Sequence, residues 1–468
     1  MIWKIARKEI KETLREGRFR IAGVIVLALL SIAVVISYNY YNYVQDQHAQ
    51  ASTNTRNLWT SQDEKNPHSA AHYGTYAFKP KSPLSLIDQG VDKFTGISIF
   101  LEAHRRNEAQ FIAAADQTGL ARFGDLTPDF ILLFIIPLLI ILMGYNSFGK
   151  ERENGTLKLL QSQGVPPGKV ALGKWLGLYM PILFLTAGLF LSAGLMLALT
   201  PNFGMFSWTA LLLMTLVYLI YYGVFANLTL IISAWAKSGG IALVLLLSIW
   251  IITCLATPKA ASNFADALYP YPTRQEFMAD VSEDRKKGLD GHNPWNKEAK
   301  LLEKETLEEY GVDSIHQLPF NFDGYRMQKG EEHEAEVYFK HYQLLKDQFN
   351  QQSHFYSMSA AVSPYLPTRF LSMAIARTDY GLHWDFADAA ERYRLKMMEA
   401  LNMDFAENSA YGNWAYKADQ SLWEGIPDFS YTPPTIGQIA VRHLSNFLLL
   451  ATWLVISFLG LFWITRKL

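Results

Sequence analysis

The stretch 128–200 decides the fold, because two long apolar runs flank a short charged segment. The first run is PDFILLFIIPLLIILMGYNSF (128–148), and the second is WLGLYMPILFLTAGLFLSAGLMLALT (175–200). Between them lies KERENGTLKLLQSQGVPPGKVALGK (150–174), in which basic residues outnumber acidic ones. A bilayer core about 30 Å thick takes roughly 20 residues of apolar helix. The stretch therefore predicts two membrane-spanning helices joined by a polar hairpin.

Further apolar runs lie on both sides of this hairpin. The sequence predicts an all-α membrane protein, with six transmembrane helices and a mostly helical extracytoplasmic domain. The predicted spans are 19–41, 128–148, 172–199, 208–235, 241–256 and 446–464. The other predicted segments are a cytoplasmic helix (1–18), an extracytoplasmic insertion (42–127), a cytoplasmic coupling segment (149–171) and an extracytoplasmic domain (257–440). Within the insertion, residues 99–119 are predicted to be helical.

Basic residues indicate which side of the membrane each connection faces. They gather before the first span, in the hairpin at 150–174, at Lys237 and at Arg466 and Lys467, whereas the loop TPNFGMFS (200–207) has none. Because basic residues favour the cytoplasmic side, both termini are predicted to be cytoplasmic. The two long polar segments are then outside the membrane.

The N-terminal segment predicts an amphipathic helix. Ile2, Ala6, Ile10 and Leu14 recur at helical spacing, with Trp3 beside them and charged residues on the other face. Such a helix lies in the membrane interface with its tryptophan at headgroup depth, in contact with lipid. The alternative is a helix packed on its own protein. The predicted interfacial residues are Trp3, Ala6, Ile10 and Leu14.

Composition excludes several functions. A net charge of −1 gives no support for nucleic-acid binding, which requires a basic face, and a single cysteine, Cys254, excludes an intrachain disulfide. The phosphate-binding pattern GxxxxGK[ST] is absent, and GVPPGK (164–169) carries prolines where backbone N–H donors would be required. We therefore expect no cofactor in this chain, and any ATP and Mg²⁺ to bind in a partner subunit.

Histidines give the only hint of a metal site. The chain has eleven, and His333 with His341 on one predicted helix could hold an ion. Their eight-residue spacing and the absence of HExxH favour a solvated helical face instead. No GxSxG motif is present. We therefore assign no catalytic and no metal-binding residue.

The coupling segment has the pattern of a docking surface. Thr156 is predicted to be the N-cap of a short amphipathic helix, LKLLQ (157–161). Leucines exposed on such a helix would present an apolar knob to a soluble partner. The predicted docking residues are Glu151, Arg152, Glu153, Asn154, Gly155, Thr156, Leu157, Leu159 and Leu160.

At this segment the sequence resembles the permease subunits of type-2 ABC transporters. The motif stands here as ERENGTL (151–157), followed by Leu159, Leu160 and Pro166, and Lys158 replaces a typical acidic residue. The whole chain is similar to a branch that has a large domain of unknown function between spans five and six. This branch is similar to the permeases of gliding-motility and nitrous-oxide-reductase maturation clusters. The resemblance implies a bacterial inner membrane and docking of cytoplasmic ABC ATPase subunits on the motif.

The function expected from these features is that of a non-catalytic permease subunit. It would pair with a second permease, identical or not, and couple ATP hydrolysis by its partners to substrate export. An alternative is a mechanotransmission complex, which drives work on an extracytoplasmic partner without a transport path. A membrane-anchored extracytoplasmic enzyme or receptor is a third interpretation, but it would not need an apolar cytoplasmic knob.

Overall fold

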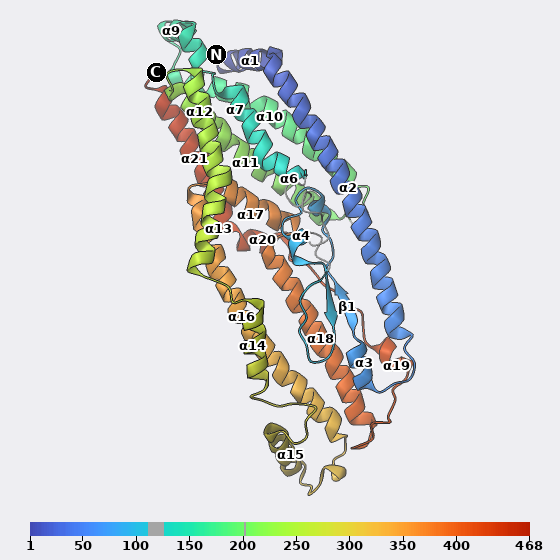
Figure 1. Ribbon diagram of the computed structural model, residues 1–468. Helices are drawn as coiled ribbons and strands as arrows, with labels where there is room; N and C mark the ends of the chain where they lie inside the picture. The colour runs from blue at the N-terminus through green and yellow to red at the C-terminus, as the bar shows by residue number, and fades with distance from the viewer. Residues whose placement is uncertain (111–125, 201–202) are drawn as a thin grey trace.

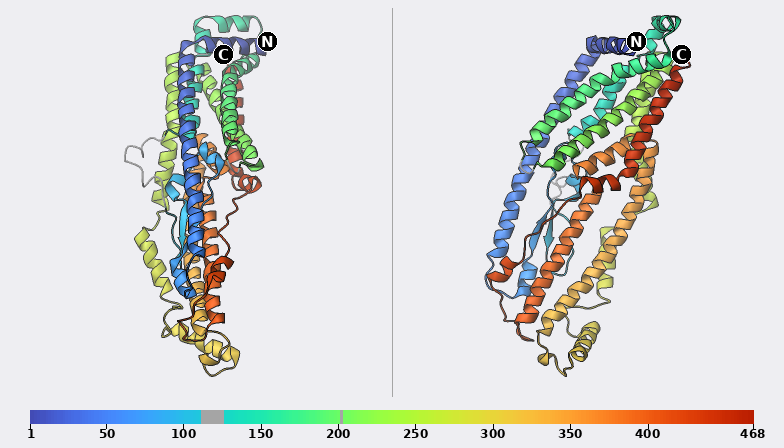
Figure 2. Two further views of the ribbon diagram at one scale, coloured as in Figure 1. Left: turned by 90° about the vertical axis from the view of Figure 1, so that its right-hand side faces the viewer. Right: turned by 180° about the vertical axis from the view of Figure 1, so that it is seen from behind.

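The computed structural model describes residues 1–110, 126–200 and 203–468. The molecule is elongated, with a bundle of long helices at one end and a second helical layer extending away from it (Figure 1). Both termini lie at the free end of the bundle in every view (Figure 2). We call this the terminal end. We call the layer at the opposite end, built from described residues of 61–126 and 269–443, the distal domain.

Six helices among the described residues are long and apolar enough to cross a membrane, so the predicted all-α membrane fold is confirmed. The first, third, fourth and sixth are α2 (Gly17–Thr60), α10 (Pro167–Leu197), α11 (Met205–Trp235) and α21 (Leu444–Thr465). The second consists of α6 (Pro128–Phe130), η3 (Ile131–Ile135) and α7 (Ile136–Gly144). The fifth consists of α12 (Gly239–Trp250), η4 (Ile251–Ala256) and α13 (Thr257–Leu268).

Two of these helices continue far beyond the predicted spans. Helix α2 has 44 residues and is therefore about 66 Å long, roughly twice the thickness of a bilayer core. Its polar end packs on the distal domain, where the Trp59 indole Nε1 donates to the carbonyl of Trp423 at 3.0 Å. The fifth helix likewise continues past residue 256 to Leu268. The membrane bundle and the distal domain therefore share continuous helices.

Both π-helical turns, η3 and η4, are followed closely by a proline. Pro137 has no N–H to donate to the carbonyl of Leu133, four residues earlier, and an α-helix would leave that carbonyl unpaired. The Tyr221 hydroxyl from α11 donates to it instead at 2.9 Å. Before Pro258, the Ser363 hydroxyl donates to the carbonyl of Thr253 at 2.6 Å. Side chains from neighbouring segments thus satisfy the backbone that each proline disturbs.

The distal domain is mostly helical, as predicted. Between spans one and two it has α3 (Pro67–Tyr73), β1 (Thr75–Phe78), η1 (Pro83–Leu86), α4 (Asp92–Thr95) and β2 (Ser98–Leu101). Between spans five and six it has α14 (Arg274–Arg285), α15 (Lys297–Tyr310), η5 (Ile315–Gln317), α16 (Phe322–Met358), η6 (Ser359–Ala361), α17 (Tyr365–Ala376), α18 (Tyr380–Asn408), α19 (Gln420–Gly425) and α20 (Ile436–Arg442). The long helices α16 and α18 pack side by side (Figure 1).

The helix predicted at 99–119 is wrong at its start. Residues 98–101 form strand β2, which pairs antiparallel with β1 so that Thr75 lies opposite Leu101 and Phe78 opposite Ser98. The side chains of β1 are mostly half-buried and those of β2 mostly buried, which suits aromatic and β-branched residues on a partly covered hairpin. Residues 111–119 of the prediction lie outside the described residues.

Helix α17 joins the two layers. Its Leu371 and Ile375 belong to the same buried cluster as the apolar side chains of α7 and α11. A separate core within the distal domain contains Phe386, Leu401 and Trp423. The distal domain therefore rests on the bundle through a shared apolar surface, which makes relative sliding of the two layers costly.

Candidate functional site

The predicted coupling segment lies at the terminal end and forms two short helices, α8 (Gly149–Glu153) and α9 (Thr156–Ser162) (Figure 1). Gly155 joins them with a φ of 72°, a left-handed conformation that favours glycine, and it is the N-cap of α9. The prediction of Thr156 as the N-cap is therefore wrong. Thr156 is the first helical residue, and its hydroxyl donates to the carbonyl of Glu151 at 3.2 Å.

A buried group of charges holds the base of this segment. The ammonium of Lys174 on α10 is 1% exposed and lies 2.8 Å from Glu9 Oε1 and 3.2 Å from Glu151 Oε2. Lys174 also donates to the carbonyl of Ser147 at 2.9 Å. Lys8 pairs with Glu151 Oε1 at 2.6 Å. Burial alone lowers the pKa of Lys8, but the hydrogen bond and charge of Glu151 raise it above its ordinary value.

These contacts connect three segments that are far apart in the sequence, namely α1 (Ile2–Arg15), α8 and the start of α10. Helix α1 packs along α10 at two glycines. A Cβ at Gly173 would lie 2.7 Å from Ile5 Cβ, and one at Gly177 would overlap the Cβ of Glu9. Only hydrogen at both positions allows this approach, which brings Glu9 to Lys174.

Helix α1 thus packs on its own protein through one face, as in the second interpretation of its amphipathic pattern. Ala6 is buried and Ile10 is half-buried, whereas Trp3 and Leu14 are exposed. The four predicted interfacial residues therefore do not form one common surface. Trp3 and Leu14 remain free for lipid or a partner, and Ala6 belongs to the contact with α10.

The predicted docking residues separate into anchors and exposed groups. Arg152 donates to the carbonyls of Ala236 at 2.7 Å and Ala234 at 2.6 Å, at the end of α11. Leu157 is buried in the bundle core, so its predicted place in an exposed apolar knob is wrong. Leu159 is 56% exposed and Leu160 is half-buried. The other exposed members are Glu153, Asn154, Gly155 and Thr156.

A second polar cluster lies where the bundle meets the distal domain. One nitrogen of the Arg369 guanidinium on α17 lies 2.8 Å from Asp88 Oδ1 and 2.7 Å from Asp129 Oδ2, the latter at the start of the second span. The Ser372 hydroxyl donates to Asp88 at 2.6 Å and lies 3.0 Å from the hydroxyl of Tyr218 on α11. Burial raises the pKa of Asp88 to about 6, in spite of Arg369.

Sequence reasoning missed this cluster. Asp129 is the acid at the start of the second span, and its partner Arg369 lies 240 residues later in the chain. The available signal was Arg369, a lone charge in the otherwise apolar helix YLPTRFLSMAIA (365–376). Such a charge is buried only where an opposite charge meets it.

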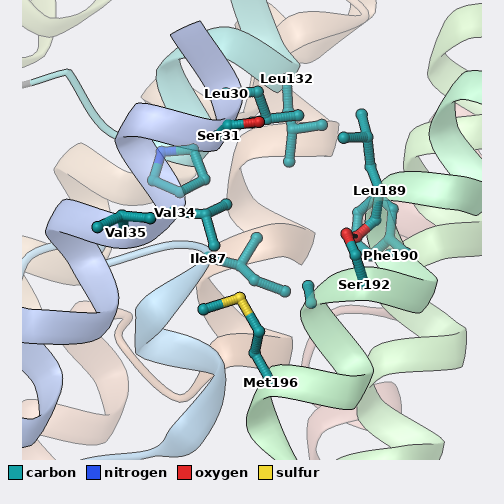
Figure 3. A pocket seen from close by; sticks show the side chains of 12 residues that line it. Leu30, Ser31, Val34, Val35, Ile87, Leu132, Leu189, Phe190, Ser192 and Met196 are labelled. Atoms are coloured by element: carbon teal, nitrogen blue, oxygen red, sulfur yellow. Dashed lines mark hydrogen bonds between the residues drawn. The ribbon is translucent and has the colours of Figure 1, made fainter. Parts of the chain in front are cut away.

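An apolar cavity of about 240 Å³ opens between α2 and α10. Figure 3 shows Val34 of α2 and Phe190 of α10 on opposite sides of it, with Ile87 between them. Serines 31 and 192 are its polar members, and none of the described residues that line it is charged. The cavity can accept an acyl chain or an apolar side chain of another subunit.

His333 and His341 do not come together as metal ligands. His341 Nε2 lies 2.9 Å from Asp284 Oδ2, so it is engaged in a hydrogen bond with α14. Neither residue belongs to a group of potential ligands among the described residues. Four other histidines converge instead in the distal domain, at positions 68, 72, 104 and 292.

Comparisons with known proteins match both parts of the chain. A family model described as ABC-2 family transporter protein matches residues 21–258, just over half of the 468 residues. A second model, described as a domain of unknown function (DUF3526), matches residues 274–432. This second match covers most of the distal domain between spans five and six. A search of curated proteins finds no match.

Proposed function

The chain belongs to the ABC-2 family of transporter proteins, and from this premise we propose that it is the permease subunit of an ABC transporter. Separate ATPase subunits bind ATP and Mg²⁺ and drive the complex, since this sequence lacks the phosphate-binding motif. The multi-pass chain lies in a bacterial inner membrane with its terminal end in the cytoplasm. It pairs with a second permease, identical or different, and the complex exports a substrate.

The observation that carries this proposal is the construction of the coupling segment. Its base is fixed to the bundle by Arg152 and by the pair of Glu151 with Lys174, while Leu159 is exposed beyond these anchors. An exposed apolar side chain on a rigidly held helix suits docking of a soluble partner. Force applied to the segment would pass directly into α8, α10 and α1.

The same arrangement offers a route to the distal domain. The second spanning helix runs from Asp129 at one end to the coupling segment at the other. At the distal end, Arg369 ties Asp129 to α17. A displacement of the coupling segment therefore reaches the distal domain through one helix and one charge pair.

The test is copurification of the ATPase with the tagged permease after Leu159→Asp. We expect loss of the ATPase with normal membrane insertion, because a charge replaces the apolar docking group. Leu344→Asp is the matched control, since Leu344 on the distal helix α16 is 55% exposed and Leu159 is 56% exposed. Leu157→Asp is unsuitable because Leu157 is buried. Equal recovery of the ATPase with both variants would reject docking at Leu159.

A mechanotransmission complex is the second candidate. The pairs of Arg369 with Asp88 and Asp129, which we call the Arg369 bridge, favour it, because they connect a spanning helix to the distal domain without requiring a transport path for a substrate. The two candidates differ in their need for the apolar cavity. Ala193→Trp would fill the cavity between α2 and α10. Loss of cellular function, with unchanged ATP-dependent movement of spin labels on the distal domain, supports export. Retained cellular function supports mechanotransmission.

A further inference from the structure

Four histidines from three separate segments of the distal domain converge on one point. His68 and His72 lie one turn apart on α3, His104 follows β2, and His292 lies between α14 and α15. The Nε2 atom of His68 lies 3.1 Å from that of His72 and 3.0 Å from that of His292. One ring nitrogen from each of the four lies within 4.8 Å of all the others.

This spacing suits a shared ion. A tetrahedral ion with metal–nitrogen bonds of about 2.0–2.1 Å holds its ligand atoms roughly 3.3 Å apart. Hydrogen bonds alone do not explain the cluster. The Nε2 atom of a neutral His68 is either a donor or an acceptor, so it can form a hydrogen bond with only one of the two neighbouring rings. Four imidazoles without a thiolate are the donor set that zinc, copper(II) and nickel prefer, whereas magnesium and calcium prefer oxygen.

The contacts of His104 are those expected of a metal ligand. Its Nδ1 lies 2.7 Å from Glu331 Oε1, and its backbone N–H donates to the same oxygen at 2.7 Å. Arg394, fully buried, donates to Glu331 Oε2 at 2.9 Å and fixes that carboxylate. The other ring nitrogen, Nε2, is buried and has no hydrogen-bond partner within the described part of the chain. A carboxylate beside one ring nitrogen and no hydrogen-bond partner at the other is the usual environment of a metal-binding histidine.

The backbone of His104 supports the same conclusion. Its φ is 64°, which places a non-glycine residue in the left-handed region. Such conformations cost free energy and occur where the surrounding structure requires a particular side-chain position. Here the turn after β2 directs the ring toward the other three histidines, at centroid distances of 5.7 Å from His68 and 4.4 Å from His292.

The cluster is accessible to ions from solvent. His72, His104 and His292 line an open cavity of about 790 Å³, whose other charged residues are both acidic and basic. The side chains of His72 and His292 are exposed, and those of His68 and His104 are half-buried. A metal ion can therefore enter without rearrangement of the fold.

We propose that His68, His72, His104 and His292 form a binding site for a divalent transition-metal ion. The first three lie within the region that matches the transporter family, and His292 lies within the region that matches the domain of unknown function. A bound ion links these two regions, so it stabilises the attachment of α14 and α15 to the hairpin that follows the first span. This proposal is independent of the proposed transport function.

The test uses the full-length chain in detergent, freed of metal with EDTA and then titrated with Zn²⁺ alone. We expect one tightly bound Zn²⁺ per chain and a higher Tm in its presence, because an ion that binds only the folded state stabilises it. Replacement of Zn²⁺ by Co²⁺ should give the intense visible absorption of a tetrahedral cobalt site. Absence of bound Zn²⁺ in the wild-type chain overturns the proposal.

Two variants separate ligand loss from unfolding. His72→Ala/His292→Ala removes the two exposed ligands, and we expect loss of the bound Zn²⁺, of the cobalt spectrum and of the zinc-dependent rise in Tm. His316→Ala is the matched control, because His316 is exposed in the distal domain but lies outside the cluster. Metal-free Tm values of the three proteins report the fold. Equal zinc binding by the double variant and the control overturns the assignment of these ligands.

Discussion

Lys174→Met should release α1 from the bundle. Methionine keeps much of the length and apolar volume of lysine but removes its charge and its three donors. In the wild type, the buried ammonium neutralises Glu9 and Glu151 and bonds the carbonyl of Ser147. In the variant, the two carboxylates face each other across the contact between α1 and α8 without the shared cation.

The magnitude follows from the burial of Lys174. Removal of one partner from a buried ion pair costs about 3–5 kcal/mol. Lys8 remains 2.6 Å from Glu151 and still neutralises it, so we take the lower end of this range. A free-energy change of about 3 kcal/mol changes a population by roughly 100-fold, since each 1.4 kcal/mol is about tenfold. The undocked state of α1 should therefore become about 100 times more populated.

Limited trypsin digestion measures this population. The basic residues of α1 are cleaved only when the helix leaves α10 and unfolds, so the cleavage rate follows the open population when reclosing is fast. We expect the cleavage rate within residues 1–20 to rise by roughly 100-fold in Lys174→Met. Lys150→Met is the matched control, because its pair with Glu12 at 3.4 Å is exposed and exposed pairs contribute only about 0–1 kcal/mol.

A second variant shows whether unpaired charge is the cause. Lys174→Met combined with Glu9→Gln and Glu151→Gln removes the carboxylates that the single change leaves exposed to each other. This variant should recover most of the protection, because replacement of a whole buried ion group is far less costly than removal of one partner. Equal cleavage rates for Lys174→Met and Lys150→Met would refute the reasoning.

Three further changes test the contacts between segments. Gly177→Leu should displace α1 and accelerate its cleavage by trypsin. Gly188→Leu on the same helix should not, because a Cβ at that position meets nothing within 4 Å. Similar cleavage rates for the two variants would contradict close packing at Gly177. Arg369→Met should leave ATPase copurification intact but abolish ATP-dependent movement of spin labels on the distal domain, and undiminished movement would exclude the Arg369 bridge as the route. Asp88 has a folded-state pKa of about 6 against an ordinary 3.8, so its stabilising contribution is complete below pH 3.8 and is lost as pH rises through 6. The Tm of the wild type relative to Asp88→Asn should therefore rise as pH falls from 7 to 4.5, and a constant difference would disprove the raised pKa of Asp88.

The spans were predictable because membrane insertion depends on local composition. A run such as residues 128–148 must satisfy its backbone internally in lipid, so length and hydropathy are sufficient to identify it. The helical character of the distal domain followed from apolar periodicity, as in α18 with Phe386, Ala390 and Met397. The same reasoning failed at 98–101, because strand pairing with β1 is a contact between segments and not a local property.

The sequence predicts where the coupling segment lies, but it does not reveal how the segment is built. The motif at 151–157 predicts a docking surface, yet Leu157 and Leu159, two residues apart, have opposite environments. Their difference depends on which face of α9 meets the bundle. Likewise, the contact of α1 with α10 depends on Gly173 and Gly177, whose significance appears only once the two helices cross.

The sequence by itself determined the number of spanning helices, and it predicted their orientation and the position of the proposed coupling segment. These depend on interactions with lipid and water that each short stretch makes independently of the others. Only the tertiary structure decided which charges pair and which histidines converge. Lys174 meets Glu9 across 165 positions, Arg369 meets Asp88 across 281 and His292 meets His68 across 224. Such contacts arise when packing of apolar surfaces brings distant segments together, and no local pattern encodes the partner.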